Sequence, residues 1–271
     1  MRQKEYKTTA RSYFIMNKMI ARILTLLIVF TLAAPLFAIA QDEAIHIKTT
    51  EEFLAFSKQC TLDRWSQGKK VVLQANIDLT DTEFSGVPTF GGIFDGNGHT
   101  ITGLAMNAKG PVTGLFRYLQ KGGVIQNLTV QGTVTAEEKS TCAGIVGENR
   151  GSVLSSSFGG DIRGGSIVGG IAGINEASGI IGDCMVNGTI SAQKYTGGIA
   201  GENFGKISAC TNQASVNTTA SEETFQLKNI NLENLEESAL TPIRGHTDVG
   251  GIAGYSSGMI ENSKNFGQIG Y

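Results

Sequence analysis

A repeated glycine-flanked unit constrains this chain more than any other feature of its sequence. Four copies enclose a short apolar core between small residues, at Ala143–Gly147, Gly169–Gly173, Gly197–Gly201 and Gly250–Gly254. A weaker copy, Thr113–Arg117, precedes them. Successive copies start 30, 26, 28 and 53 residues apart. A unit that recurs at about 20 to 50 residues predicts a solenoid or a propeller, because each unit buries its apolar face only against its neighbours.

Short strands within each unit favour a solenoid. A second and a third apolar segment follow each core, as in Gly123–Leu128 and Gly132–Val134, so we expect three short strands per repeat. The strands are rich in Ile and Val and are bounded by Gly, Asn and Ser, which suits parallel strands stacked coil on coil. We therefore predict an all-β fold, a parallel β-helix (solenoid) of about five to seven coils.

Aligning the coils gives two columns that test this prediction. The positions five residues after each second-strand glycine are Leu128, Ser156, Cys184, Cys210 and Ser263. These residues are small or apolar, as an interior ladder at the ~4.8 Å spacing of neighbouring strands requires. Cys184 and Cys210 then lie on adjacent coils, where we expect buried free thiols, with a disulfide as the alternative. Asn149, Asn175 and Asn203 form a second column at a corner between strands, where we expect each side chain to hydrogen-bond a turn.

The N-terminal segment has the features of an export signal. Residues Ile23–Ala40 are apolar, follow Lys18 and Arg22, and end in a small-x-small pattern, so we predict a signal peptide over 1–40 with cleavage after Ala40. A membrane anchor is the alternative, although the apolar stretch is short for a bilayer span. After cleavage we expect no integral membrane span. The predicted location is secreted or on a bacterial cell surface, with the periplasm as another destination.

The rest of the chain divides into a cap and a repeat region. We expect 41–89 to form an N-terminal cap, in which a helix from about Thr50 to Cys60 uses the capping-box spacing of Thr49 and Glu52 and covers the first coil. Residues 90–271 form the β-helix repeats. An acidic stretch at about 217–247 interrupts them and must leave the coil laterally, either as a binding loop or as a tolerated insertion.

Charge and cysteine content exclude several classes of protein. The chain has 22 basic and 24 acidic residues; residues 1–40 hold six and one of these, which leaves 16 and 23 and a net charge of −7 for 41–271. Nucleic acid is a poor partner for such a chain. The four cysteines include no CxxC pair, and none follows the cleavage point directly, so neither a zinc ribbon nor a lipoprotein anchor is predicted.

With these residues in view, the chain resembles the GLUG-motif proteins, bacterial secreted or surface proteins whose repeats follow a Gly-Leu-x-Gly pattern. Four copies match with Ile in place of Leu, at Gly144–Gly147, Gly170–Gly173, Gly198–Gly201 and Gly251–Gly254. Gly114–Arg117 keeps the Leu but loses the second Gly. The resemblance covers roughly Phe90–Tyr271 and implies a right-handed β-helix. The motif also occurs beside the catalytic domain of zinc-dependent immunoglobulin A proteases, so the resemblance implies a bacterial surface or secreted protein without naming its target.

Catalytic chemistry is not evident in the sequence. A metalloprotease needs two histidines one helical turn apart beside a glutamate, whereas His46, His99 and His246 are isolated. A carbohydrate-cleaving β-helix needs carboxylates clustered across neighbouring coils, and Asp161 and Asp183 stand alone. The pair Asp95 and His99 is explained by a glycine turn. We predict no catalytic, cofactor-binding or metal-binding residue, and no cofactor.

These observations favour a non-catalytic module for binding, adhesion or structure, and not an enzyme. Its expected partner is an extracellular glycan or a surface protein of a host or of the surrounding microbial community. Two alternatives stay open at this stage. One is a polysaccharide lyase or hydrolase built on a β-helix, and the other is a truncated accessory fragment without an independent function.

Overall fold

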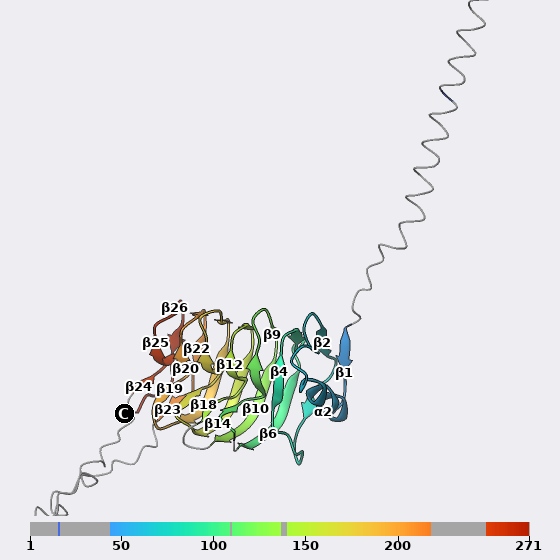
Figure 1. The fold of residues 1–271 in the computed structure, drawn as a ribbon. Coiled ribbons are helices and arrows are strands. Elements are labelled where there is room, and N and C mark those ends of the chain that lie inside the picture. Colours follow the sequence, from blue (N-terminus) through green and yellow to red (C-terminus); the bar gives the residue numbers. More distant parts are fainter. Residues whose placement is uncertain (1–15, 17–43, 109, 137–139, 218–247, 271) are drawn as a thin grey trace, which may run out of the picture. The chain divides into compact units, whose positions relative to one another are not determined.

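The computed structural model describes residues 16, 44–108, 110–136, 140–217 and 248–270 of this chain. Ala44–Tyr271 forms one compact unit. All strand pairs among the described residues are parallel, and the strands stack as a β-solenoid of about six turns with a single short helix near residue 50 (Figure 1). The predicted all-β parallel solenoid and its N-terminal helix are confirmed.

Four parallel sheets make up the walls of the solenoid. Sheet A contains β1 (Ile45–Ile47), β2 (Lys70–Leu73), β5 (Ile93–Asp95), β9 (Val124–Gln126), β13 (Ser152–Leu154), β17 (Ile180–Gly182), β21 (Lys206–Ser208) and β26 (Met259–Glu261). Sheet B contains β3 (Ile77–Asp78), β6 (Thr100–Ala108), β10 (Thr129–Ala136), β14 (Ser157–Gly164), β18 (Met185–Ser191), β22 (Thr211–Asn212), β23 (Ser215–Val216) and β27 (Lys264–Asn265). Sheet C contains β4 (Val87–Phe90), β8 (Phe116–Leu119), β12 (Val146–Asn149), β16 (Ala172–Asn175), β20 (Ala200–Asn203) and β25 (Ala253–Ser256). Sheet D contains β7 (Val112–Thr113), β11 (Thr141–Ala143), β15 (Ile167–Gly169), β19 (Tyr195–Gly197) and β24 (Asp248–Gly250).

A complete coil therefore has four strands, and the prediction of three strands per repeat is wrong. The glycine-flanked core is the source of the difference. In the coil that starts at Thr141, strand β11 ends at Ala143 and strand β12 starts at Val146, so Gly144 and Ile145 form a bend between two strands of different sheets. The core thus turns a corner of the solenoid and does not run straight as one strand.

The glycine directly before the Ile of each core is required by close packing across the interior. A Cβ atom on Gly144 would overlap the ring of Phe158, which projects inward from sheet B on the same coil. A Cβ on Gly170 would lie 2.5 Å from Cγ1 of Val186, so the same clash recurs on the next coil. No positive φ is involved at either glycine. The repeat keeps glycine here because no space is left for a side chain.

Positive φ angles occur at another corner, between sheets A and B. Five non-glycine residues stack there with φ between 46° and 54°: Asn127, Ser155, Asp183, Ala209 and Asn262. Asparagine is the side chain that best tolerates this left-handed conformation, yet only two of the five are Asn. Several residue types therefore adopt the left-handed conformation at this corner.

The predicted asparagine column lies at the corner between sheets C and A and forms a ladder. Asn149, Asn175 and Asn203 are in register and fully buried. Nδ2 of Asn149 donates to Oδ1 of Asn175 at 2.7 Å, and Nδ2 of Asn175 donates to Oδ1 of Asn203, also at 2.7 Å. The backbone amide of Gly151 donates to Oδ1 of Asn149 at 3.0 Å. The expected hydrogen bond to a turn is confirmed, and the amides also bind one another from coil to coil.

The interior column of small residues is confirmed. Its register follows from the pairing of the flanking strands, which aligns Leu128, Ser156, Cys184, Cys210 and Ser263. The first four are buried and Ser263 is half-buried. Cys184 and Cys210 are free thiols, as predicted, and the disulfide alternative is not formed. The hydrogen bond with Cys210, together with burial, raises the pKa of the Cys184 thiol.

The helix α2 (Thr50–Gln59) covers the first coils at the N-terminal end (Figure 1). The predicted capping box is present, since the amide of Glu52 donates to Oγ1 of Thr49 and the amide of Thr49 donates to Oε2 of Glu52, both at 3.3 Å. Phe53 and Phe56 are buried beneath the helix. They join a cluster of aromatic rings with centroids 5.2–6.4 Å apart: Phe53, Phe56, Phe90, Phe94 and Phe116.

Two predictions concern other parts of the chain. The signal peptide over 1–40, apart from Met16, lies outside the described residues, as does most of the acidic stretch at 217–247.

The segment predicted as a cap contributes strands to the solenoid. Its strands β1, β2 and β4 already pair within sheets A and C. In the part of the chain that the structure describes, no helix has the length and apolar character needed to cross a membrane.

Candidate functional site

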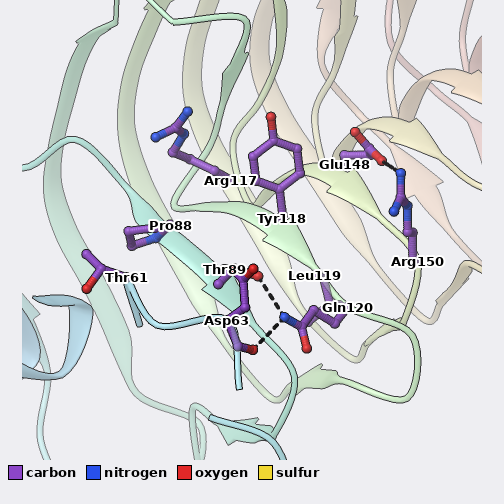
Figure 2. Close-up of a pocket in the computed structure, with 10 residues that line it drawn as sticks. All are labelled: Thr61, Asp63, Pro88, Thr89, Arg117, Tyr118, Leu119, Gln120, Glu148 and Arg150. Atoms are coloured by element: carbon purple, nitrogen blue, oxygen red, sulfur yellow. Dashed lines mark hydrogen bonds and ion pairs between the residues drawn. The ribbon is translucent and has the colours of Figure 1, made fainter. Parts of the chain in front are cut away.

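A cleft on the outer face of sheet C is the candidate functional site (Figure 2). It encloses about 370 Å³. Strands β4, β8 and β12, the residues that directly follow them and the loop after α2 supply its lining: Thr61, Asp63, Pro88, Thr89, Arg117, Tyr118, Leu119, Gln120, Glu148 and Arg150. Three successive coils and a loop outside the repeat pattern therefore build this cleft together.

Strand register sets the spacing of the side chains that line the cleft. Thr89, Tyr118 and Glu148 occupy one column, because β4 pairs with β8 and β8 pairs with β12 without a shift. Gln120 and Arg150 form the next column, one residue beyond the aligned pair Leu119 and Asn149. Neighbouring residues in each column are about 4.8 Å apart. The sheet therefore presents two rows of polar side chains at fixed intervals.

Arg117 lines the cleft because the weaker copy of the repeat has arginine where the other copies have glycine. It stands where the complete copies have their second glycine, for example Gly147 on the next coil. A Cβ atom on Gly147 would overlap the side chain of Val112, so that coil has no room for a larger residue. In the weaker copy, Nε of Arg117 donates to the carbonyl of Val112 at 3.1 Å, and its Cζ lies 5.8 Å from the ring centroid of Tyr118. Figure 2 shows the two side chains next to one another at the cleft.

Gln120 joins the sheet to the loop that follows α2. Its Nε2 donates to the carbonyl of Asp63 at 2.7 Å and to Oγ1 of Thr89 at 3.0 Å (Figure 2). Its Oε1 accepts a hydrogen bond from Nε2 of Gln67 at 2.9 Å. A side-chain amide that uses both its nitrogen and its oxygen is held in one orientation. These bonds fix one wall of the cleft.

An ion pair on the next coil, beside Gln120, forms another part of the lining. Nη2 of Arg150 lies 2.5 Å from Oε1 of Glu148 (Figure 2). The Glu148 side chain is 14% exposed and the Arg150 side chain is 59% exposed, so the carboxylate is largely covered while its partner reaches solvent. Since a covered carboxylate is stable only when its charge is compensated, Arg150 is held beside it.

The accessible polar groups of the cleft include strong hydrogen-bond donors and one unpaired carboxylate. They comprise the guanidinium groups of Arg117 and Arg150, the phenol of Tyr118, the hydroxyl of Thr61 and the carboxylate of Asp63. The carboxylate of Glu148 is paired with Arg150. Such a set of groups binds the oxygen atoms of a polar ligand.

The residues considered for chemistry in the sequence take structural positions. Oδ1 of Asp95 accepts hydrogen bonds from the amide of Asn97 at 2.9 Å and from Nδ2 of Asn127 at 3.1 Å. Nε2 of Gln126 donates to its Oδ2 at 2.9 Å. Burial raises the pKa of Asp95, but these hydrogen bonds outweigh it and lower the pKa overall. The turn interpretation of the Asp95 and His99 segment is confirmed, since the amide of His99 closes the turn on the carbonyl of Gly96 at 2.8 Å.

The other candidates are also separate from one another. Oδ1 of Asp161 accepts a hydrogen bond from Oγ1 of Thr189 on the next coil, and Asp183 lies at the left-handed corner. Nδ1 of His46 is 3.0 Å from Nε2 of Gln74, and His246 lies outside the described residues. Within the described ranges, no three His, Cys, Asp or Glu side chains gather as a metal ion requires.

Most residues of the cleft follow no pattern in the sequence. Only Arg117 was singled out, as the point where the weaker copy loses its second glycine. That departure was the available signal: a large charged residue at a position that packing otherwise restricts to glycine must project away from the stack. Gln120, Glu148 and Arg150 carry no comparable pattern.

Two known proteins are similar to this chain, one in sequence and one in fold. No family model matches it. It is 30% identical over 146 residues to halomucin from Haloquadratum walsbyi. The aligned segment covers 54% of this chain and 1% of halomucin. Its structure is similar to that of a "putative immunoglobulin A1 protease" from Bacteroides ovatus, with a TM-score of 0.59 and 19% identity, over 85% of this chain and 68% of the other. The chain is thus similar in sequence to a small part of halomucin, and in fold to the Bacteroides protein.

Proposed function

We propose that this protein is an exported, non-catalytic binding module and that it holds an extracellular glycan in the cleft on sheet C. The observation that carries the proposal is the composition of the cleft, where donors from Arg117, Tyr118 and Arg150 converge on a volume of about 370 Å³. Sugars present many hydroxyl oxygens and an apolar ring face, and an arginine beside a tyrosine offers a partner to each.

The proposed location at the cell surface or outside the cell has two supports. The predicted signal peptide over 1–40 directs export. About half of this chain is similar in sequence to part of a protein whose name, halomucin, describes it as a mucin. The Gly-Ile-x-Gly copies are proposed to be GLUG-type repeats that form a rigid carrier for the cleft, since each coil pairs with its neighbours through all four sheets.

A glycan and matrix-protein array tests the proposal directly. The full chain is expressed with its export segment, purified, and applied at several concentrations beside Tyr118→Ala and the matched control Arg163→Met, whose arginine is exposed on sheet B. We expect a defined set of glycans to bind the wild-type chain and the control, and the Tyr118→Ala variant to lose them. Silence across all glycans, or binding only to proteins, contradicts the proposal.

The proposed absence of catalysis has its own experiment. Polysaccharides that bind on the array are incubated with the wild-type chain and analysed for new reducing ends and for unsaturated products. We expect neither, because hydrolysis of a glycosidic bond uses two carboxylates and the Glu148 carboxylate is engaged with Arg150, which leaves only Asp63 unpaired among the lining residues. The appearance of either product that is lost in Glu148→Gln would show that the cleft is an active site.

A further inference from the structure

The charge distribution within the cleft narrows the ligand class. Arg117 has one hydrogen-bond partner among the described residues, the carbonyl of Val112, which binds its Nε. That bond orients the guanidinium group and leaves its two terminal nitrogens available for a ligand. The lining holds two arginines and two carboxylates, and Glu148 is already paired with Arg150. Asp63 uses only its backbone carbonyl, on Gln120, and its exposed carboxylate belongs to the loop after α2. Arg117 is therefore the arginine of the described cleft whose positive charge is left for a ligand.

A guanidinium group fits one kind of ligand group especially well. Its planar fork forms two parallel hydrogen bonds to a carboxylate, and such charge-assisted bonds are shorter and stronger than neutral ones. Tyr118 lies beside this fork, with its ring 5.8 Å from Cζ of Arg117. A sugar ring packed on the tyrosine would bring a carboxylate on that ring within reach of the arginine.

The rest of the protein limits how many charges the ligand can carry. Residues 41–271 have a net charge of −7, so a densely charged polyanion meets long-range repulsion before it reaches the cleft. A ligand with a single carboxylate gains the local contact and meets little of that repulsion. The volume of about 370 Å³ also lies at the lower end of the range for small-molecule sites, which suits one or two sugar rings.

We infer that the sheet C cleft recognises an acidic saccharide, with Arg117 binding its carboxylate and Tyr118 supporting its ring. This inference rests on the proposed function, because it names the ligand class of the same cleft. Arg150 lies on the next coil beside Glu148 and contributes its exposed guanidinium nitrogens to the hydroxyl groups of the ligand.

Titration calorimetry with matched probes tests the inference. The probes are a disaccharide that ends in glucuronic acid and its methyl ester, which has the same shape without the charge. We expect the acid to bind the wild-type chain roughly tenfold more tightly or better, because bonds to a charged acceptor exceed neutral ones by that factor. Arg117→Met should reduce the affinity for the acid to that for the ester, and Arg117→Lys should recover only part of the difference.

Control variants separate the outcomes. Arg163→Met removes an exposed arginine from another sheet and should change neither affinity. Thermal unfolding of each variant, followed by circular dichroism, shows whether Arg117→Met is folded, and Arg117→Gln serves in its place if it is not. Tyr118→Phe should retain the affinity for both probes, and Tyr118→Ala should lose the affinity for both. Equal affinity for acid and ester overturns the inference while the proposed function stands. If glycans of every class fail to bind on the array, the proposed function itself fails.

Discussion

The first coils and the later coils fill the same interior position in different ways. Phe90 and Leu119 occupy it near the N-terminal end, and Asn149, Asn175 and Asn203 continue the column in register. A second column changes in the same direction, from apolar side chains to paired amides, over Phe158, Val186, Asn212 and Asn265. The backbone pairing is parallel throughout, so one architecture accepts two kinds of interior.

The apolar interior and the amide interior represent two physical ways to stabilise a coil. Apolar packing depends on the area removed from water and tolerates a change of shape. An amide ladder depends on direction, since each Asn must donate to one neighbour and accept from the other, and a buried amide without partners costs free energy. We therefore expect the aromatic end to tolerate apolar exchange and the ladder to reject it.

Phe94→Ala should have the largest effect. Phe94 is fully buried and its ring centroid lies 5.2 Å from that of Phe116 and 5.7 Å from that of Phe56. Removal of the ring should lower the free energy of unfolding by about 3–5 kcal/mol, whereas Phe94→Leu should lower it by about 1.5 kcal/mol. Urea unfolding followed by circular dichroism measures both. If the two variants lose the same stability, shape tolerance is not a property of this end.

Asn175→Leu is expected to rank second and tests the ladder. The substitution keeps the size of the side chain but leaves Oδ1 of Asn203 without its donor, and it removes the 2.7 Å bond from Nδ2 of Asn149. Each buried group left unpaired costs about 1–3 kcal/mol, so we expect a loss of about 3 kcal/mol in the same urea experiment. Leu119→Met, an apolar exchange in the same column, is the matched control and should cost less than about 1.5 kcal/mol. Equal costs for the two variants would remove the distinction between the regions.

Alkaline unfolding shows whether the two regions exclude water equally. Burial raises the pKa of Cys142, on a coil that holds a ladder Asn, from its ordinary value of 9.0 to about 12. Between these values the unfolded thiol has lost its proton while the folded thiol keeps it, so stability falls as pH rises, by at most about 1.4 kcal/mol per pH unit. From pH 8 to pH 10.5 we expect Cys142 to contribute about 2 kcal/mol to the loss of stability, and Cys142→Ala should remove this contribution.

Cys60 provides the counterpart at the aromatic end, since burial raises its pKa to about 12 as well. The same pair of urea titrations, carried out on Cys60→Ala, should also show a weaker pH dependence than the wild-type chain. A pH dependence that is unchanged in Cys142→Ala but reduced in Cys60→Ala would indicate that water reaches the ladder coils.

Thr49→Ala should have the smallest effect and concerns the N-terminal end alone. The variant removes the Oγ1 that accepts a hydrogen bond from the amide of Glu52, and loss of such a cap costs about 1 kcal/mol. Thr135→Ala, on an exposed strand position, should stay within about 0.5 kcal/mol of the wild-type chain. Thermal unfolding resolves the two. A cap variant no less stable than the control would show that α2 is held by the packing of Phe53 and Phe56 and not by its cap.

Sequence periodicity was sufficient to predict the solenoid and its register. The Cys184 and Cys210 positions were correctly aligned because inserted lengths between coils are small and each strand pairs with its equivalent one coil away. The fourth strand was missed because the bend at Gly144 and Ile145 lies inside an apolar motif, where no proline or polar turn residue marks it. A glycine selected by contact with Phe158 is not distinguishable in sequence from a glycine selected by its φ angle.

The candidate site was largely beyond prediction. Its wall depends on the bond between Gln120 and the carbonyl of Asp63, which are 57 residues apart, and Asp63 belongs to a loop that has no counterpart in the repeat. Periodicity relates positions one coil apart and carries no information about such a contact. Arg117 is the exception, because it replaces the second glycine of a repeated motif and the replacement is visible in the sequence.

Strand pairing across the acidic stretch has a consequence for protein engineering. Strand β24 aligns with β19, Tyr195 opposite Asp248 and Gly197 opposite Gly250, although residues 217–247 separate β23 from β24 in the chain. Coil-to-coil alignment is therefore maintained across a long interruption of the repeat. This junction, which supplies no residue of the cleft on sheet C, is the place to introduce a foreign domain if the solenoid is used as a scaffold for display.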